Sequence, residues 1–181
     1  MNNLESRPII SAILLKYENG QGFVYLQERW KPKVSPTYSG MLEIPAGGID
    51  AYENVYDALA REVEEECGLK ITKIIGDYKS EIIQPREKDK SFVFKPFICQ
   101  QVLETDNGLP WIGFVFVCLT EGEIKINPDE ARNPQWVSLD QLKEMLDRDK
   151  TQFFPLQLPV LQYLCKNIES ISQGLGADIT T

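Results

Sequence analysis

Short apolar runs separated by turn residues mark the first part of the chain. Residues 8–17 (PIISAILLKY) and 22–29 (GFVYLQER) are two such runs, and a turn containing E-N-G lies between them. Apolar runs of this length, bounded by turn residues, predict a pair of strands. Three later β-like stretches predict further strands, at 71–83, 91–102 and 112–119.

A different spacing follows from Asn54 to Cys67. Val55, Leu59 and Val63 recur every four residues, and Gly68 comes directly afterwards. This pattern predicts a helix that ends at the glycine.

The last third of the chain contains two more helix patterns. Ser138 with Gln141 three residues later forms a capping-box pattern, which predicts a helix start. A short strand is expected at Q-W-V, directly before Ser138. A final helix is expected within 158–168, and the tail at 173–181 is expected to be frayed. Three segments read as loops because they are rich in Pro, Gly, Ser or charged residues: 31–40, 84–90 and 127–134.

Four glutamates crowd the end of the helix at 54–67. A helical wheel places Glu62, Glu65 and Glu66 in one sector that overlaps the apolar stripe, whereas Glu64 points away and reads as solvated. Acids are unfavourable at a helix C-terminus and beside one another. Arg61 can pair with Glu65, but one arginine does not neutralise three carboxylates.

A bound cation would resolve this conflict. Partly buried carboxylates without a counter-charge shift their pKa upward and become neutral. Clustered carboxylate oxygens are the ligands that Mg²⁺ or Mn²⁺ prefers, and these ions also bind substrate phosphates. The cluster therefore predicts a divalent-metal site, and the absence of a D-x-D-x-D-G loop excludes an EF-hand.

Composition narrows the chemistry further. The chain has 181 residues, which suits a single domain, and its net charge of −8 without a Lys/Arg run disfavours nucleic-acid polymers. It has no histidine, and its four cysteines are widely separated, which removes a zinc finger and any His-assisted nucleophile. The longest apolar run, 111–119, is too short to span a bilayer, so a cytoplasmic protein with no membrane association is expected.

Residues 47–69, G-G-I-D-A-Y-E-N-V-Y-D-A-L-A-R-E-V-E-E-E-C-G-L, resemble the conserved box of the Nudix hydrolases. The family pattern is G, five residues, E, seven residues, R-E, an aliphatic residue, any residue, E-E, any residue, G and an aliphatic residue. Every fixed position matches, and the box covers 23 of 181 residues. One departure is Tyr52, where a glycine commonly precedes the glutamate.

The resemblance implies an α+β fold, the Nudix-type α/β/α sandwich with a mixed central sheet and a loop-helix-loop catalytic box, here one domain over residues 1–181. It also implies a pyrophosphohydrolase that requires Mg²⁺ or Mn²⁺ and cleaves a nucleoside diphosphate linked to another moiety. By position, Glu62, Glu65, Glu66 and the Gly47 carbonyl would bind metal. Arg61 would orient a glutamate, and Glu53 would brace the loop.

The general base and the substrate stay open. Glu66 and Glu130 are both candidates for the base, because a carboxylate near the metal can accept the proton of the attacking water. Arg29 and Arg86, with Lys88 and Lys90, are candidates to meet phosphates, and Trp30, Tyr38 or Trp111 to stack on a base.

Substrate markers conflict. Pro85 lies 16 residues beyond Leu69, a spacing that resembles ADP-ribose pyrophosphatases of the family, whereas Glu130 before Trp136 resembles nucleoside triphosphate members. A non-catalytic nucleotide sensor of the same fold is the rival function, although no box glutamate is lost. The expected partner is a small nucleotide, and a homodimer is left open.

Overall fold

The computed structural model describes residues 6–106, 108, 110–168 and 171. The expected frayed tail at 173–181 lies outside the described residues. Twelve strands are present in the described part, namely β1 (Arg7–Glu18), β2 (Gln21–Arg29), β3 (Leu42–Glu43), β4 (Ala46–Gly48), β5 (Lys70–Ile74), β6 (Tyr78–Lys79), β7 (Ile83–Arg86), β8 (Asp89–Ser91), β9 (Phe94–Lys95), β10 (Ile98–Val102), β11 (Trp111–Glu121) and β12 (Ala131–Ser138). The α-helices are α1 (Val55–Cys67), α2 (Leu139–Arg148) and α3 (Leu158–Lys166), with short 3₁₀ turns at Pro36–Tyr38, Lys150–Gln152 and Pro155–Gln157.

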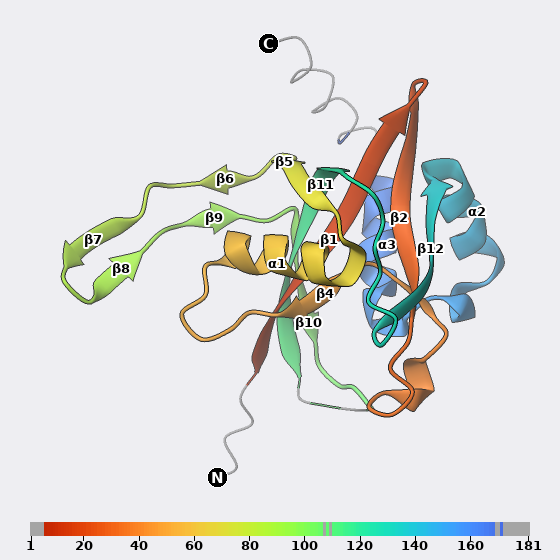
Figure 1. The fold of residues 1–181 in the computed structure, drawn as a ribbon, viewed down its shortest axis with the longest axis horizontal. Coiled ribbons are helices and arrows are strands. Elements are labelled where there is room, and N and C mark those ends of the chain that lie inside the picture. Colours follow the sequence, from red (N-terminus) through yellow and green to blue (C-terminus); the bar gives the residue numbers. More distant parts are fainter. Residues whose placement is uncertain (1–5, 107, 109, 169–170, 172–181) are drawn as a thin grey trace.

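A mixed sheet forms the centre of the molecule (Figure 1). Its main order is β10-β11-β1-β2-β12, and β3, β4 and β5 pair with β2, β1 and β11. Strands β1 and β11 are parallel, whereas the predicted β1–β2 pair is antiparallel around a turn at Asn19 and Gly20. The mixed α+β architecture confirms the expected fold class.

The two faces of the sheet are covered by different helices. In β1, Ile10, Ala12 and Leu14 pack in the cluster that contains the apolar side of α1. The intervening Ile13 and Leu15 pack in the opposite cluster, with α2 and α3. Because successive strand side chains point to opposite faces, one apolar run serves both layers of an α/β/α sandwich.

Helix α1 begins and ends where the sequence predicts. The side chain of Asn54 accepts a hydrogen bond from the backbone N–H of Tyr56, at 2.9 Å, and so caps the first turn. Gly68 adopts φ 69°, and its N–H donates to the Glu64 carbonyl. A side chain at Gly68 would also meet Cβ of Lys125 at 2.7 Å, so glycine is required twice over. The predicted capping box of Ser138 and Gln141 is likewise present.

Three predictions of local structure are wrong. The stretch 71–83 is not one strand, because the chain turns at Gly76 (φ 65°) and continues as the separate β6. The stretch 91–102 is divided into β9 and β10, with Pro96 between them. The charged loop at 84–90 contains β7 and β8, which pair with each other on an arm that projects beyond α1 (Figure 1).

The arm escaped prediction because every residue of β7 and β8 is exposed, so neither strand has a buried face to create an apolar pattern. The segment 127–134 is also only partly a loop. Strand β12 starts at Ala131 and is interrupted by a bulge near Asn133, which adopts φ 45°.

Candidate active site

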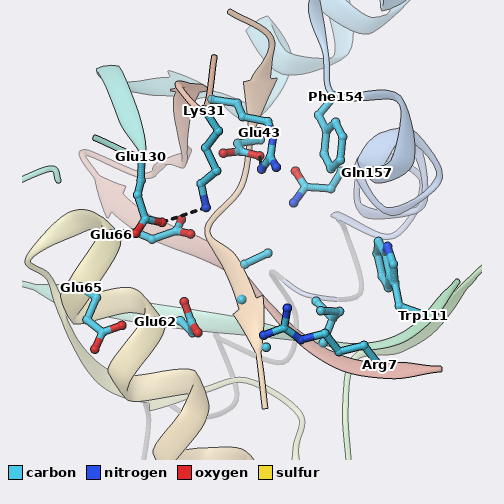
Figure 2. Close-up of a pocket in the computed structure, with 15 residues that line it drawn as sticks. Arg7, Lys31, Glu43, Glu62, Glu65, Glu66, Trp111, Glu130, Phe154 and Gln157 are labelled. Carbon is cyan, nitrogen blue, oxygen red and sulfur yellow. Dashed lines mark hydrogen bonds and ion pairs between the residues drawn. The ribbon is translucent and has the colours of Figure 1, made fainter. Parts of the chain in front are cut away.

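A pocket of about 380 Å³ lies where α1, β4, the 31–40 loop and the 153–157 segment meet (Figure 2). It is lined by Arg7, Ile9, Arg29, Lys31, Glu43, Ala46, Gly47, Gly48, Glu62, Glu65, Glu66, Trp111, Glu130, Phe154 and Gln157. Its size falls within the ordinary range of small-ligand sites. The structure therefore gathers all four predicted metal-binding residues at one cavity.

Glu66 and Glu64 differ in exposure as the helical wheel predicts, whereas Glu65 is more exposed than its predicted sector implies. Glu66 is buried, with 4% of its surface exposed, and Glu64 is exposed and does not line the pocket. Glu62 is mostly covered, whereas the Glu65 side chain is 59% exposed at the rim. The pocket thus receives carboxylates at three depths from one face of α1.

Arg61 ties the box together. Its guanidinium donates two hydrogen bonds to Glu53, at 2.8 and 2.9 Å, and one each to Glu62 (2.7 Å), Glu65 (3.2 Å) and the Gly48 carbonyl (3.0 Å). Glu53 also accepts from the backbone N–H of Asp50, at 2.9 Å. These bonds from Arg61, with that from Asp50, lower the pKa of Glu53 to about 2. The contacts suit the orienting and bracing roles implied by the resemblance.

Gly47 makes room for Glu62. A Cβ atom at Gly47 would lie 1.9 Å from the carboxyl carbon of Glu62, far inside any allowed contact. The register of β4 with β1 places Gly47 opposite Ile10, in the sheet. Only a residue without a side chain allows this carboxylate to lie against the strand.

Glu66 is embedded in a buried polar network. Nε2 of Gln27 donates to its Oε2 at 2.7 Å, and Gln27 is itself fully buried. Burial, and next the nearby charge of Glu43, raises the pKa of Glu66. Burial also raises the pKa of Glu43, which Arg29 opposes through an ion pair of 3.0 Å. Burial likewise raises the pKa of Glu62, against the lowering by Arg61.

Glu130 reaches the pocket from the turn before β12. Its carboxylate pairs with Nζ of Lys31 at 2.8 Å, and its backbone carbonyl accepts from the N–H of Trp30 at 2.7 Å. The 31–40 loop and the turn before β12 are thereby joined. Figure 2 shows Glu130 and Lys31 beside Glu66, so both candidates for the general base lie at the same cavity.

Of the two arginines predicted to bind phosphate, one lines the pocket and the other does not. Arg29 lines the pocket, where it pairs with Glu43 and lies 5.0 Å from the ring centre of Phe154. Arg86 lies on β7 in the exposed arm, outside the residues that line the pocket, and its side chain is 84% exposed. Pro85 lies on the same strand and is not among the residues that line the pocket. The structure therefore shows no contact through which this proline would select a substrate there.

Of the three aromatic candidates, Trp111 lines the acidic pocket. It also lines a neighbouring cavity of about 320 Å³, together with Arg7 and Phe154. Tyr38 is instead buried against Phe154, and Trp30 is covered by the guanidinium of Arg132, 3.5 Å from its ring centre. Of these three candidates, Trp111 is therefore the one that lines the cavity of the glutamates.

Several pocket residues were missed by the sequence analysis, namely Arg7, Lys31, Glu43, Phe154 and Gln157. Gln157 clamps Ile44 through both of its backbone groups, at 2.8 and 2.9 Å, across 113 positions of sequence. No local pattern reports such a contact. Glu43 had a signal, because an acid within the apolar M-L-E-I-P segment implies a buried partner such as Arg29.

The donor set suits a hard divalent cation. Glu62, Glu65 and Glu66 offer carboxylate oxygens at one cavity, and burial raises the pKa of Glu62 and Glu66, which disfavours their ionised forms unless a positive charge is near. Within the described residues, no three acidic or cysteine side chains are close enough to form a ready-made cluster. The carboxylates of Glu62 and Glu65 instead accept hydrogen bonds from Arg61, and that of Glu66 accepts one from Gln27.

Comparisons with known proteins identify the family of this chain. The model of the NUDIX domain matches residues 6–157, most of the chain. The chain therefore belongs to the NUDIX family, whose enzymes are pyrophosphohydrolases that act on nucleoside diphosphate derivatives and generally use a divalent metal.

Individual relatives are distant. The NAD-capped RNA hydrolase NUDT12 of Macaca fascicularis is 25% identical over 170 residues, which are 93% of this chain but 30% of that protein. The Nudix domain of Shewanella oneidensis NrtR, solved with ADP ribose, has a TM-score of 0.60 at 12% identity and covers 91% of this chain and 89% of its own. A MutT protein from Methanosarcina mazei Go1 has a TM-score of 0.57 at 22% identity, covering 90% and 96%. These likenesses confirm the fold.

Among the helices of the described residues, none has the length and apolar character needed to cross a membrane.

Proposed function

We propose that this chain, acting as a single Nudix domain, hydrolyses the phosphoric anhydride bond of a nucleoside diphosphate linked to a second group, with Mg²⁺ or Mn²⁺. The observation that carries the proposal is the meeting of Glu62, Glu65 and Glu66 with cationic and aromatic side chains at one cavity. A nucleoside diphosphate derivative suits such a cavity, because cationic groups neutralise its phosphate charge and an aromatic side chain can stack on its base.

The residues suggest a division of work. When bound, a divalent cation supplies charge neutralisation of the phosphate oxygens and an acidified water. Arg61 keeps Glu62 and Glu65 in place, and Glu130 accepts the proton of the water that attacks phosphorus. Glu130 suits this role better than Glu66, because it is 40% exposed at the cavity whereas Glu66 is buried. The P–O bond of the anhydride then breaks and leaves two phosphate products.

The adjoining cavity supports a two-part substrate. Arg7 and Trp111 are register partners on the parallel strands β1 and β11, and both line the two cavities. Arg7 brings a guanidinium to both cavities, and a guanidinium is well suited to bind a phosphate. Gly113, two positions after Trp111, has no Cβ where the indole ring lies, since one there would meet the ring at 2.8 Å. This arrangement favours a nucleoside base on Trp111 with a phosphate near Arg7.

The names of two relatives favour the same class of two-part nucleotide substrate. NrtR is solved with ADP ribose, and NUDT12 is named for NAD-capped RNA. Both ligands contain an adenosine phosphate joined through an anhydride to a second ribose. We therefore place ADP-ribose-like compounds ahead of nucleoside triphosphates as substrates.

A substrate panel tests the proposal. ADP-ribose, NADH, dinucleoside polyphosphates, CoA and normal or oxidised dNTPs are incubated with Mg²⁺ or Mn²⁺, and the products are identified. AMP with ribose 5-phosphate from ADP-ribose is the expected result. A nucleoside monophosphate with pyrophosphate would select the triphosphate class. Tight nucleotide binding with no turnover across the panel would favour the nucleotide sensor and contradict the proposal.

Replacing Trp111 by Ala tests the base-stacking surface. Stacking of a base on an aromatic side chain contributes about 1–3 kcal/mol, so KM is expected to rise at least about fivefold. The value of kcat should change little, because the glutamates lie on a different element. Steady-state kinetics on the best substrate of the panel measure both. Tyr163→Ala on α3 is the control, because Tyr163 is a partly exposed aromatic residue outside the pocket lining. An unchanged KM for Trp111→Ala would show that the nucleoside base does not stack on Trp111.

A further inference from the structure

A buried chain of hydrogen bonds runs behind Glu66. Tyr25 and Gln27 lie two positions apart on β2, and both are fully buried. The hydroxyl of Tyr25 donates to Oε1 of Gln27 at 3.1 Å, and Nε2 of Gln27 donates to Oε2 of Glu66 at 2.7 Å. The resemblance to the family box does not include either strand residue, because the box begins at Gly47.

The order of donors in this chain follows from its carboxylate end. An ionised carboxylate, the form that binds a cation, only accepts hydrogen bonds, so Gln27 presents its NH₂ group to Glu66. Its carbonyl oxygen then faces Tyr25, whose hydroxyl must donate. Reversing the amide would place an oxygen against the carboxylate and an NH₂ group against the tyrosine. By donating to the carbonyl oxygen of Gln27, Tyr25 stabilises the amide orientation that favours Glu66 as an anion.

This network also selects between the two oxygens of Glu66. Oε2 is held by Gln27 in the protein interior, while Glu66 as a whole lines the pocket. We propose that Gln27, oriented by Tyr25, is a positioning residue that turns Oε1 of Glu66 toward the pocket as a cation ligand. The inference rests on the proposed function, because it gives Glu66 a metal-binding role. Residues that hold metal ligands from behind commonly set metal affinity.

Mn²⁺ binding in the absence of nucleotide tests the inference. Free Mn²⁺ is titrated against the whole chain and followed by electron paramagnetic resonance, so the readout does not depend on turnover. Gln27→Met keeps the side-chain length but cannot donate, and its Mn²⁺ dissociation constant is expected to rise about 10- to 100-fold. Tyr25→Phe leaves Gln27 in place but releases its amide, so a smaller rise is expected.

The double variant separates positioning from packing. If Tyr25 acts only through Gln27, then Tyr25→Phe adds nothing to the affinity loss of Gln27→Met. If each residue acts independently, the two losses multiply, and that result would overturn the inference. Tyr25→Phe removes a single hydroxyl, so it remains informative even where Gln27→Met does not fold.

Ser138→Ala is the control for general destabilisation. It removes the capping box of α2, away from the pocket, and should lower the melting temperature without changing Mn²⁺ affinity. An unchanged affinity in Gln27→Met, with a wild type that binds Mn²⁺, overturns the positioning role alone. A wild type that binds no Mn²⁺ overturns the metal-dependent function as well, so the two failures are distinguishable.

Discussion

Glu66→Gln should abolish nearly all hydrolysis while leaving the protein folded. Glu66 is the most deeply buried of the box carboxylates and lines the pocket together with Glu62 and Glu65. Glutamine keeps the shape but removes the negative charge that a cation requires. Loss of one charge-stabilising group in an active site costs roughly 10²- to 10³-fold in rate, and we expect an effect at the upper end.

The fold should survive because the substitution opens no cavity. The carbonyl oxygen of the new glutamine can still accept from Nε2 of Gln27, so the buried amide keeps its partner. Initial rates on the best substrate, together with thermal melting, measure the two effects separately. A variant that melts like the wild type but is inactive is the expected outcome.

Glu64→Gln is a matched control on the same helix. Glu64 carries the same charge two positions earlier, is exposed and does not line the pocket. Its replacement should leave the rate near that of the wild type, so a shared loss in both variants would point to net charge rather than to the site. Substantial activity in Glu66→Gln would remove Glu66 from the metal-binding set.

The sequence predicts α1 and its glutamates well because both depend on local periodicity. The spacing of Val55, Leu59 and Val63 fixes the buried side of the helix, and that side determines that Glu66 is covered and Glu64 exposed. The glycine stop and the capping box depend on neighbours within a few positions, and both are observed. Local rules were sufficient here because the interactions are local.

The rest of the site depends on contacts that no local pattern encodes. Gln27 reads as one polar residue on a strand, and its bond to Glu66 spans 39 positions. The clamp of Gln157 on Ile44 spans 113 positions. Conversely, Arg86 reads as a candidate phosphate ligand in a charged loop, yet the arm carries it outside the pocket lining. Charge alone does not predict which surface loops reach a cavity.

Tyr52 shows how a departure from the family pattern can be tolerated. It adopts φ 65°, the left-handed region where glycine is favoured, and its side chain is fully exposed. The backbone strain is therefore local to the loop before Glu53. The bonds from Arg61 and from the N–H of Asp50 to Glu53 are formed despite it, so the loop keeps its brace.

Gly47→Ala should impair catalysis without changing the backbone. Gly47 does not use a left-handed conformation, so alanine fits the main chain of β4. Its Cβ, however, would lie 1.9 Å from the carboxyl carbon of Glu62, and that carboxylate must move. Displacing a catalytic group by about 1 Å can cost about 10²-fold in rate, and we expect a loss of this size. Initial rates and Mn²⁺ affinity should both decline, while the melting temperature stays near that of the wild type.

Gly48→Ala is the matched neighbour and separates displacement of Glu62 from a general effect on β4. Its Cβ would meet Nη2 of Arg7 at 2.4 Å, and Arg7 is an exposed, flexible side chain that can swing aside. Mn²⁺ affinity should therefore persist in Gly48→Ala, and KM should rise if Arg7 contacts the substrate phosphate. Equal loss of Mn²⁺ affinity in both variants would show that β4 itself is disturbed. Loss confined to Gly47→Ala would place the position of the Glu62 carboxylate, rather than the strand, at the centre of metal binding.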